Sequence, residues 1–291
     1  RAMIKIQEGC NQICAYCIVP KVRGREMSIS PQSIVTNILE LEKNSYSEVV
    51  LTGTQLGTYG FDLQDTDLYT LLMYILENTT IPRIRLSSLQ PQEITPKLLS
   101  IWDNKRMCPH FHIPLQSGSN KVLKAMRRRY TREEFRNTVE MVRKHIPESS
   151  ITTDVIVGFP GEEDKEFQET YDLCLETELA NIHTFPFSKR PGTSANLFSG
   201  QINDVSKTYR SKAINQLARA ISKRFRQHLI GQTRPVLWET KTEQNNYTIW
   251  QGLTDNYIRV KATDENIVAN TISSLKLVSL DAEIMTGVLA E

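Results

Sequence analysis

The sequence is poor in cysteine, in net charge and in long hydrophobic runs. Its 291 residues include five cysteines, a small and odd number that argues against a disulfide framework. No hydrophobic run approaches the roughly 20 residues that cross a bilayer, and no secretory segment is visible, so we expect no membrane association and a cytoplasmic location. The net charge is only +2, so nucleic-acid binding would have to depend on local patches.

Three of the five cysteines lie close together near the start. Cys10, Cys14 and Cys17 have the spacing Cys-x3-Cys-x2-Cys and follow a strand-like segment at 3–8. Iron–sulfur clusters are held by thiolates at short fixed spacings. Three thiolates on a cubane of four irons leave one iron open to a substrate or cofactor, as in reactive metal sites. The spacing therefore favours a [4Fe-4S] cluster at which chemistry takes place.

Zinc is the main alternative to a cluster. A structural zinc needs four ligands, usually including a second cysteine or histidine pair. Cys108, His110 and His112 contain residues that could complete such a set. However, residues 110–115 have a strand pattern with both histidines on one face, which is an ordinary arrangement. Spacing alone leaves zinc open.

Several segments together resemble the radical S-adenosylmethionine (SAM) enzymes and, more narrowly, their methylthiotransferase family. The match extends in family order to about Phe187. Its blocks are 5–25 with the cysteine motif, 87–91 (SSLQP), 112–118 (HIPLQSG), 126–130 (MRRRY) and 153–162 (TDVIVGFPGE).

The resemblance implies a cofactor set and a reaction. Cys10, Cys14 and Cys17 would bind a [4Fe-4S] cluster as the catalytic centre, with SAM at its open iron. Cleavage of SAM would give a radical that removes hydrogen from an adenine base of tRNA, where a methylthio group is then installed. The implied partners are tRNA, an electron donor and a sulfur source.

Strand and helix patterns alternate through the first two thirds of the chain, which predicts a parallel sheet with helical crossovers. The resemblance favours a partial (β/α)6 barrel. Thr131 with Glu134 forms a capping box, and Ser30 precedes a proline at a helix start. Strands are expected at 3–8, 48–52, 83–87, 110–115, 151–158 and 180–187; helices at 31–44, 67–78, 95–103, 119–127, 131–146, 163–177 and 204–230.

Small or polar residues follow most of these strands. Such residues suit a cofactor pocket, although ordinary βα turns favour the same types. The resemblance implies that one set of residues lines the SAM pocket. This set is Tyr16, Gly53, Thr54, Ser88, Gln116, Asp154, Gly158 and Glu162.

Two runs carry basic residues without acidic ones, Lys121–Arg132 and 207–228 in the long helix. They could neutralise phosphates or form solvated surface. The candidates for RNA contacts are Arg127, Arg128, Arg129, Arg219, Lys223 and Arg224.

The last part of the chain is all β, with short strands expected at 234–240, 246–252, 256–262, 273–280 and 284–289. This pattern suggests a small barrel of the OB type. Residues 252–260 (GLTDNYIRV) resemble a TRAM domain, an RNA-binding module. Tyr257 and Arg259 are RNA-contact candidates, whereas Trp250 fits either stacking on RNA or a small core. We therefore expect a radical SAM domain at 1–230 and a TRAM-like RNA-binding domain at 231–291.

Residues 52–60 (TGTQLGTYG) look most like the enzymes that modify threonylcarbamoyladenosine beside the anticodon. Methylthiolation of isopentenyladenosine, a radical SAM enzyme of other chemistry and a non-catalytic RNA-binding protein are the alternatives. The family normally begins with a domain whose three further cysteines hold a second [4Fe-4S] cluster. The sequence starts at Arg1 without that triplet, so we expect a fragment that cleaves SAM and binds RNA but does not insert sulfur.

Overall fold

A computed structural model describes residues 1–244 and 247–290. Six parallel strands and one short antiparallel strand, β2, form two sheets. Their strand orders are β2-β1-β3-β4 and β5-β6-β7. The bridge Ser88–His112 joins the sheets beyond the end of β4. The strands are β1 (Ala2–Glu8), β2 (Met27–Ser28), β3 (Glu48–Gly53), β4 (Arg83–Leu86), β5 (His110–His112), β6 (Ser150–Val157) and β7 (Asn181–Pro186). This arrangement is the six-stranded partial barrel expected from the sequence.

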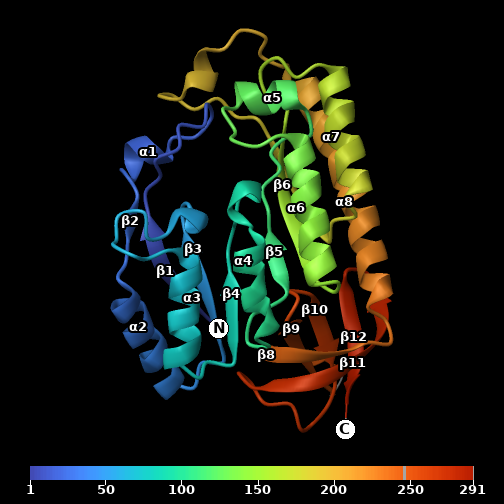
Figure 1. The fold of residues 1–291 in the computed structure, drawn as a ribbon. Helices are drawn as coiled ribbons and strands as arrows, with labels where there is room; N and C mark the ends of the chain where they lie inside the picture. Colours follow the sequence, from blue (N-terminus) through green and yellow to red (C-terminus); the bar gives the residue numbers. More distant parts are fainter. Residues whose placement is uncertain (245–246, 291) are drawn as a thin grey trace.

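Helices cover the outer faces of both sheets (Figure 1). Their starts follow local chemistry, because Thr131 accepts a hydrogen bond from Glu134 N and Ser30 accepts one from Ser33 N, which confirms both expected caps. The helices are α1 (Val19–Val22), α2 (Pro31–Lys43), α3 (Leu68–Asn78), α4 (Pro96–Leu99), α5 (Asn120–Ala125), α6 (Arg132–His145), α7 (Asp164–Glu176) and α8 (Asp204–His228).

Some boundaries differ from those predicted. The sequence patterns missed α1 and β2, which are too short to show periodicity. The helix expected at 95–103 is α4 followed by a 3-10 turn, Ser100–Asp103. The helix expected at 119–127 ends earlier because Arg127 has a left-handed backbone, with φ of 59°.

A closed β barrel follows α8, with strand order β10-β12-β11-β8-β9. Its five strands agree with the sequence pattern; the turn expected at 245–246 lies outside the described residues. Trp238 and Trp250 are buried in the barrel core, so Trp250 takes the core alternative. The strands are β8 (Thr233–Gln244), β9 (Tyr247–Thr254), β10 (Arg259–Ala262), β11 (Ile272–Asp281) and β12 (Ile284–Leu289).

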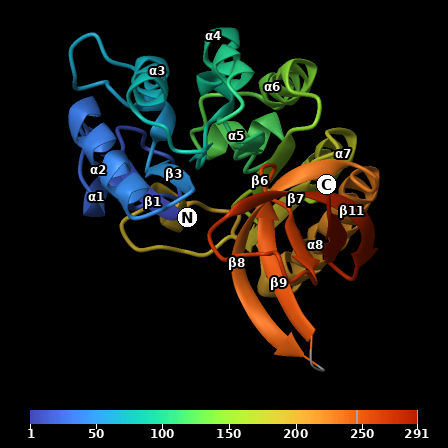
Figure 2. The same ribbon diagram turned by 90° about the horizontal axis from the view of Figure 1, so that it is seen from below.

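The barrel lies beneath the β5–β7 sheet and the end of α8 (Figures 1 and 2). Two buried arginines of β4 join it to the sheets: Arg83 donates to the Leu253 carbonyl at 3.0 Å and Arg85 to the Asp255 carbonyl at 3.0 Å. Glu48 on β3 pairs with both arginines. Burial favours a raised pKa for the Glu48 carboxyl, but the two cations outweigh it and lower that pKa.

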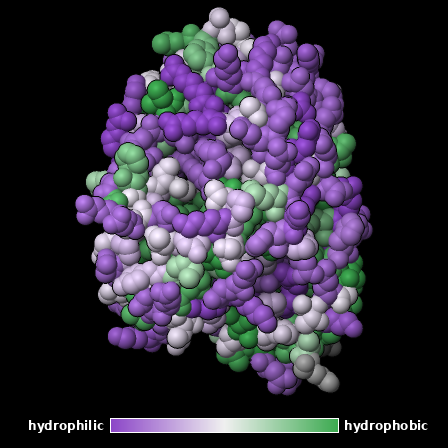
Figure 3. All heavy atoms as spheres, in the orientation of Figure 1, coloured by the Kyte–Doolittle hydropathy of each residue, from purple (hydrophilic) through white to green (hydrophobic). Residues whose placement is uncertain are grey.

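The outer surface shown in Figure 3 is mainly hydrophilic, with hydrophobic side chains scattered over it. Among the described residues, we find no helix long and apolar enough to cross a membrane. The main hydrophobic core instead lies between the two sheets and their helices, and a separate core fills the β barrel.

Candidate functional site: a cysteine-lined cavity

The three cysteines lie in the loop between β1 and α1. Gly9 starts this loop with φ of +73°, and a Cβ at this position would lie 1.9 Å from the Arg25 carbonyl oxygen. The Cys10 amide donates to the Gly24 carbonyl at 3.2 Å, and the Cys17 amide donates to the Cys14 carbonyl at 3.1 Å. The loop is thus held by backbone hydrogen bonds, and none of its three cysteines forms a disulfide.

All three thiols line one cavity of about 220 Å³, which we call the cysteine cavity. Thr54 and Gln55 reach it from the end of β3, Ser88 from beyond β4, and Gln116 from beyond β5. The ends of four strands therefore meet where function gathers in parallel β/α folds.

The spacing of the thiols fits a cluster better than a single zinc ion. Among the described residues, only His112, Asp154 and His183 form a group of three or more possible metal ligands whose donor atoms all lie within 4.8 Å of one another. At least two of the three cysteine sulfurs are therefore more than 4.8 Å apart. Tetrahedral zinc with bonds of about 2.3 Å holds its sulfurs closer than that. Cys108 lines a different cavity, near Arg83 and Asp255. The zinc set with Cys108 is therefore not assembled.

A buried polar network borders the cysteine cavity. Gln90 donates to the Gln55 side chain at 2.5 Å, and Gln55 in turn contacts the Glu93 carboxylate. Burial raises the pKa of Glu93 to about 7, against the opposing hydrogen bonds from Gln90 and Gln55. Sequence reasoning missed Gln55, Gln90 and Glu93, although their position directly after β3 and β4 was a usable signal.

Arg128 differs from its expected place on an RNA-binding surface. Its Nη1 donates to Sγ of Cys14 at 3.3 Å, and its Nη2 donates to the side chain of Gln90 at 2.9 Å. The guanidinium also lies over the Tyr130 ring, 4.9 Å from the centroid. Arg128 thus places a positive charge beside the thiols, which bind metal as thiolates.

A second cavity, of about 300 Å³, adjoins the first and shares Tyr16, Cys17 and Gln116 with it. Asp154 and Phe187 also line it. We call this second space the strand-end cavity. The ring of Tyr16 packs against the ring of Phe159 with 6.4 Å between their centroids, and burial raises the pKa of the Tyr16 hydroxyl. Five of the expected SAM residues line one or both of these two cavities: Tyr16, Thr54, Ser88, Gln116 and Asp154. Gly53 precedes Thr54 at the end of β3 and lines neither cavity.

Two further expected SAM residues, Gly158 and Glu162, also line neither cavity. Gly158 has φ of +72°, and a Cβ there would lie 2.4 Å from Cγ of Lys207 on α8. The Glu162 carboxylate accepts from the Gly158 amide at 2.7 Å and from Arg210 of α8 at 2.9 Å. Burial raises the pKa of Glu162, although these contacts oppose it. In this structure, therefore, Glu162 holds α8 against the sheet.

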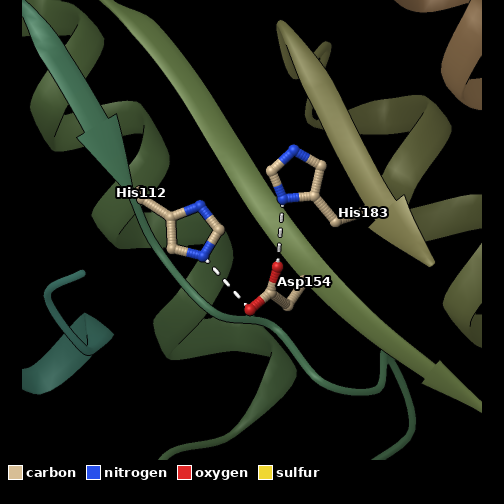
Figure 4. Close-up of side chains that lie close together, drawn as sticks. All are labelled: His112, Asp154 and His183. Carbon is tan, nitrogen blue, oxygen red and sulfur yellow. Dashed lines mark ion pairs between the residues drawn. The ribbon is translucent and has the colours of Figure 1, made fainter. Parts of the chain in front are cut away.

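A His–Asp–His group lies inside the partial barrel (Figure 4). Oδ2 of Asp154 is 3.2 Å from Nε2 of His112, and its Oδ1 is 3.3 Å from Nδ1 of His183. Burial favours a raised pKa for Asp154, but both histidines outweigh it and lower the pKa strongly. Asp154 raises the pKa of His183. The alternation of strand residues predicted that His110 and His112 share a face, but not that His183 joins His112.

The expected RNA-contact residues are spread over three regions. Arg127 and Arg129 are exposed beyond α5, and Arg219, Lys223 and Arg224 are exposed on α8. Arg224 pairs with Glu178 at 2.6 Å. Tyr257 differs from expectation, because its ring stacks on His110 at 4.4 Å and so faces the sheets. Arg259 lies nearby, 3.8 Å from Glu239.

The match to a family model agrees with this architecture. The model described as "Radical SAM superfamily" matches residues 4–174, more than half of the chain, and these contain the three cysteines and most of both cavities. The chain therefore belongs to the radical SAM superfamily, whose members use a [4Fe-4S] cluster and SAM.

Among curated proteins, the chain is similar to enzymes named as tRNA methylthiotransferases. The chain is 38% identical over 274 residues to "Threonylcarbamoyladenosine tRNA methylthiotransferase MtaB" of Bacillus subtilis, covering 92% of this chain and 60% of that protein. It is 37% identical to "tRNA-2-methylthio-N(6)-dimethylallyladenosine synthase" of Caldicellulosiruptor saccharolyticus, covering 91% of this chain and 56% of that protein. The chain thus spans less than two thirds of the relatives' length.

Solved structures support the fold. The radical SAM methyltransferase TsrM of Kitasatospora setae gives a TM-score of 0.57 at 15% identity, covering 67% of this chain and 38% of that one. The coproporphyrinogen III oxidase HemN of Escherichia coli gives a TM-score of 0.51 at 12% identity, covering 87% of this chain and 66% of that one.

Proposed function

We propose that this chain carries the radical SAM and RNA-binding parts of a tRNA methylthiotransferase that acts on threonylcarbamoyladenosine next to the anticodon. The main support is the cysteine cavity, in which three thiols meet polar strand ends next to a second cavity. The similarity to curated tRNA methylthiotransferases over about nine tenths of the chain gives the reaction class.

In this proposal Cys10, Cys14 and Cys17 hold a [4Fe-4S] cluster, and the strand-end cavity receives SAM. Such a cluster, when bound, supplies the electron that splits SAM. The chain's own residues orient the reactants and exclude water: Arg128 balances thiolate charge, while Tyr16 forms an apolar wall. A second [4Fe-4S] cluster, an electron donor and a sulfur source would lie outside this chain.

The proposed RNA-binding parts are the β8–β12 barrel at 231–291, taken as a TRAM-like OB barrel, and the exposed arginines Arg127, Arg129 and Arg219 with Lys223. Five strands in a closed barrel suit an oligonucleotide-binding fold. The choice of threonylcarbamoyladenosine depends on residues 52–60, which supply Thr54 and Gln55 to the cysteine cavity.

Deuterium transfer tests the substrate without requiring sulfur insertion. Anticodon stem-loop RNAs would carry threonylcarbamoyladenosine, isopentenyladenosine or adenosine, each deuterated at C2 of the base. With reduced, cluster-loaded protein and SAM, we expect deuterium in 5′-deoxyadenosine only with the first RNA. Transfer from the isopentenyl RNA instead would reassign the substrate, and transfer from none would reject the proposed base chemistry.

A further inference from the structure

A cavity of about 400 Å³ lies between the two sheets and the β barrel, outside the cysteine site. We call it the lumen cavity. Its volume falls in the range of small-molecule sites. Ser88 lines both this cavity and the cysteine cavity, so the two cavities adjoin at this residue.

The lining of the lumen cavity is strongly basic. Four arginines contribute to it, and no aspartate or glutamate side chain is among the described residues that line it. Three of the four arginines pair with carboxylates: Arg85 with Glu48, and Arg1 and Arg259 with Glu239. Among the described residues, Arg226 is the one arginine of the wall without a carboxylate partner, and a cation of this kind suits an anionic ligand.

Three polar atoms of this wall lack a hydrogen-bond partner among the described residues. They are Ser87 Oγ, His110 Nδ1 and Arg226 Nε, each with almost no accessible surface. His110 as a whole is 6% exposed. Buried donors and acceptors are normally paired, so these three atoms are unusual. Because they have almost no accessible surface, a ligand in the cavity would contact the accessible parts of the same side chains and not these atoms. Burial lowers the pKa of Arg226, and an anion beside its guanidinium would offset that cost.

We propose that the lumen cavity binds the carboxylate of the threonylcarbamoyl substituent, with the guanidinium of Arg226 as its main donor. The inference rests on the proposed function, because it places the adenine near Ser88 between the two cavities. The substituent carries a carboxylate, a hydroxyl and a urea linkage, whereas a dimethylallyl group has no polar atom and would leave the guanidinium without an anionic partner. Met3 and Leu86, also in the wall, would contact its apolar parts.

Binding of nucleosides tests the cavity separately from RNA binding. Ligands for nuclear magnetic resonance titration of the full chain are threonylcarbamoyladenosine, its carboxylate methyl ester and isopentenyladenosine. We expect the acid to bind on the order of tenfold more tightly than the ester, because the ester removes a charge-assisted hydrogen bond. Arg226→Gln should abolish this difference while retaining the melting temperature. Equal affinity of acid and ester for the wild-type chain would overturn the proposal.

Stem-loop RNAs separate the carboxylate from a backbone phosphate as the bound anion. Arg226→Gln should weaken binding of the acid-bearing RNA alone, whereas Arg219→Gln on the same helix should affect acid, ester and unmodified RNAs alike. Equal weakening of all three RNAs by Arg226→Gln would assign Arg226 to phosphate and reject the inference. If the chain binds the acid nucleoside more tightly than its ester but binds none of the RNAs, the carboxylate site is supported and RNA is rejected as the substrate.

Discussion

Nη1 of Arg128 lies 3.3 Å from Sγ of Cys14, which brings a cation from the end of α5 to the cysteine loop that follows β1. Its neighbours Arg127 and Arg129 are exposed. Within this run of three arginines, Arg128 contacts the cysteine loop and the other two face solvent. Single substitutions can therefore test the two roles separately.

Arg128→Gln is expected to reduce iron retention and stability. The change removes donors to Cys14, Gln90 and Tyr130, and a hydrogen bond to a charged group contributes about 1.5–3 kcal/mol. Arg129→Gln is the matched control, which should keep its iron and melting temperature and weaken RNA binding instead. Iron content after anaerobic reconstitution and thermal unfolding are the measurements; equal effects of both variants would contradict the structure at this position.

Arg210→Met should destabilise the protein strongly, by about 3–5 kcal/mol, because it leaves the Glu162 carboxylate buried without its cation. Arg224→Met is the matched control on the same helix, since its partner Glu178 is exposed and such pairs contribute about 0–1 kcal/mol. Chemical unfolding of both variants compares them. A small effect at Arg210 would show that Glu162 has another role.

The His183–Asp154 pair should make stability depend on pH. Asp154 raises the pKa of His183 above its usual 6.5, so the pair stabilises the folded state below pH 6.5 and this contribution is lost as pH rises through the folded value. Because the side chain of His183 is 51% exposed, we expect at most about 1 kcal/mol. His183→Gln should therefore cost more stability at pH 5.5 than at pH 8.5, by roughly this amount.

His228→Gln provides the comparison, because this exposed histidine on α8 contacts a backbone carbonyl of its own helix. Thermal unfolding of both variants at the two pH values is the measurement. If His183→Gln and His228→Gln behave alike, the pair with Asp154 does not contribute.

Local signals in the sequence were enough for the strands, the helix caps and the gathering of the three cysteines in one loop. Period-two and helical patterns are properties of neighbouring residues, and strand ends of a parallel sheet gather by topology, which is why Thr54, Ser88 and Gln116 were expected together. The contact of Glu162 with Arg210 was not predicted, because Arg210 is 48 residues away on a helix whose packing no local pattern reveals.

The directions in which single side chains point are a second feature that the sequence did not reveal. Arg127, Arg128 and Arg129 are chemically identical, and the sequence does not reveal that Arg128, after the left-handed turn at Arg127, points toward Cys14. Tyr257 likewise has φ of 71° and stacks on His110 of the other part of the molecule. Such choices depend on tertiary contacts that form after the local elements.

The central claim is that Cys10, Cys14 and Cys17 hold a cluster that cleaves SAM, and one anaerobic assay tests it most directly. The chain would be reconstituted with iron and sulfide, reduced with SAM present, and assayed for metal content and 5′-deoxyadenosine. We expect about four irons per chain and cleavage that Cys14→Ala abolishes, while Cys174→Ala, a change in the core, retains both. Zinc in place of iron, or a well-folded, cluster-loaded protein that leaves SAM intact, would contradict the account.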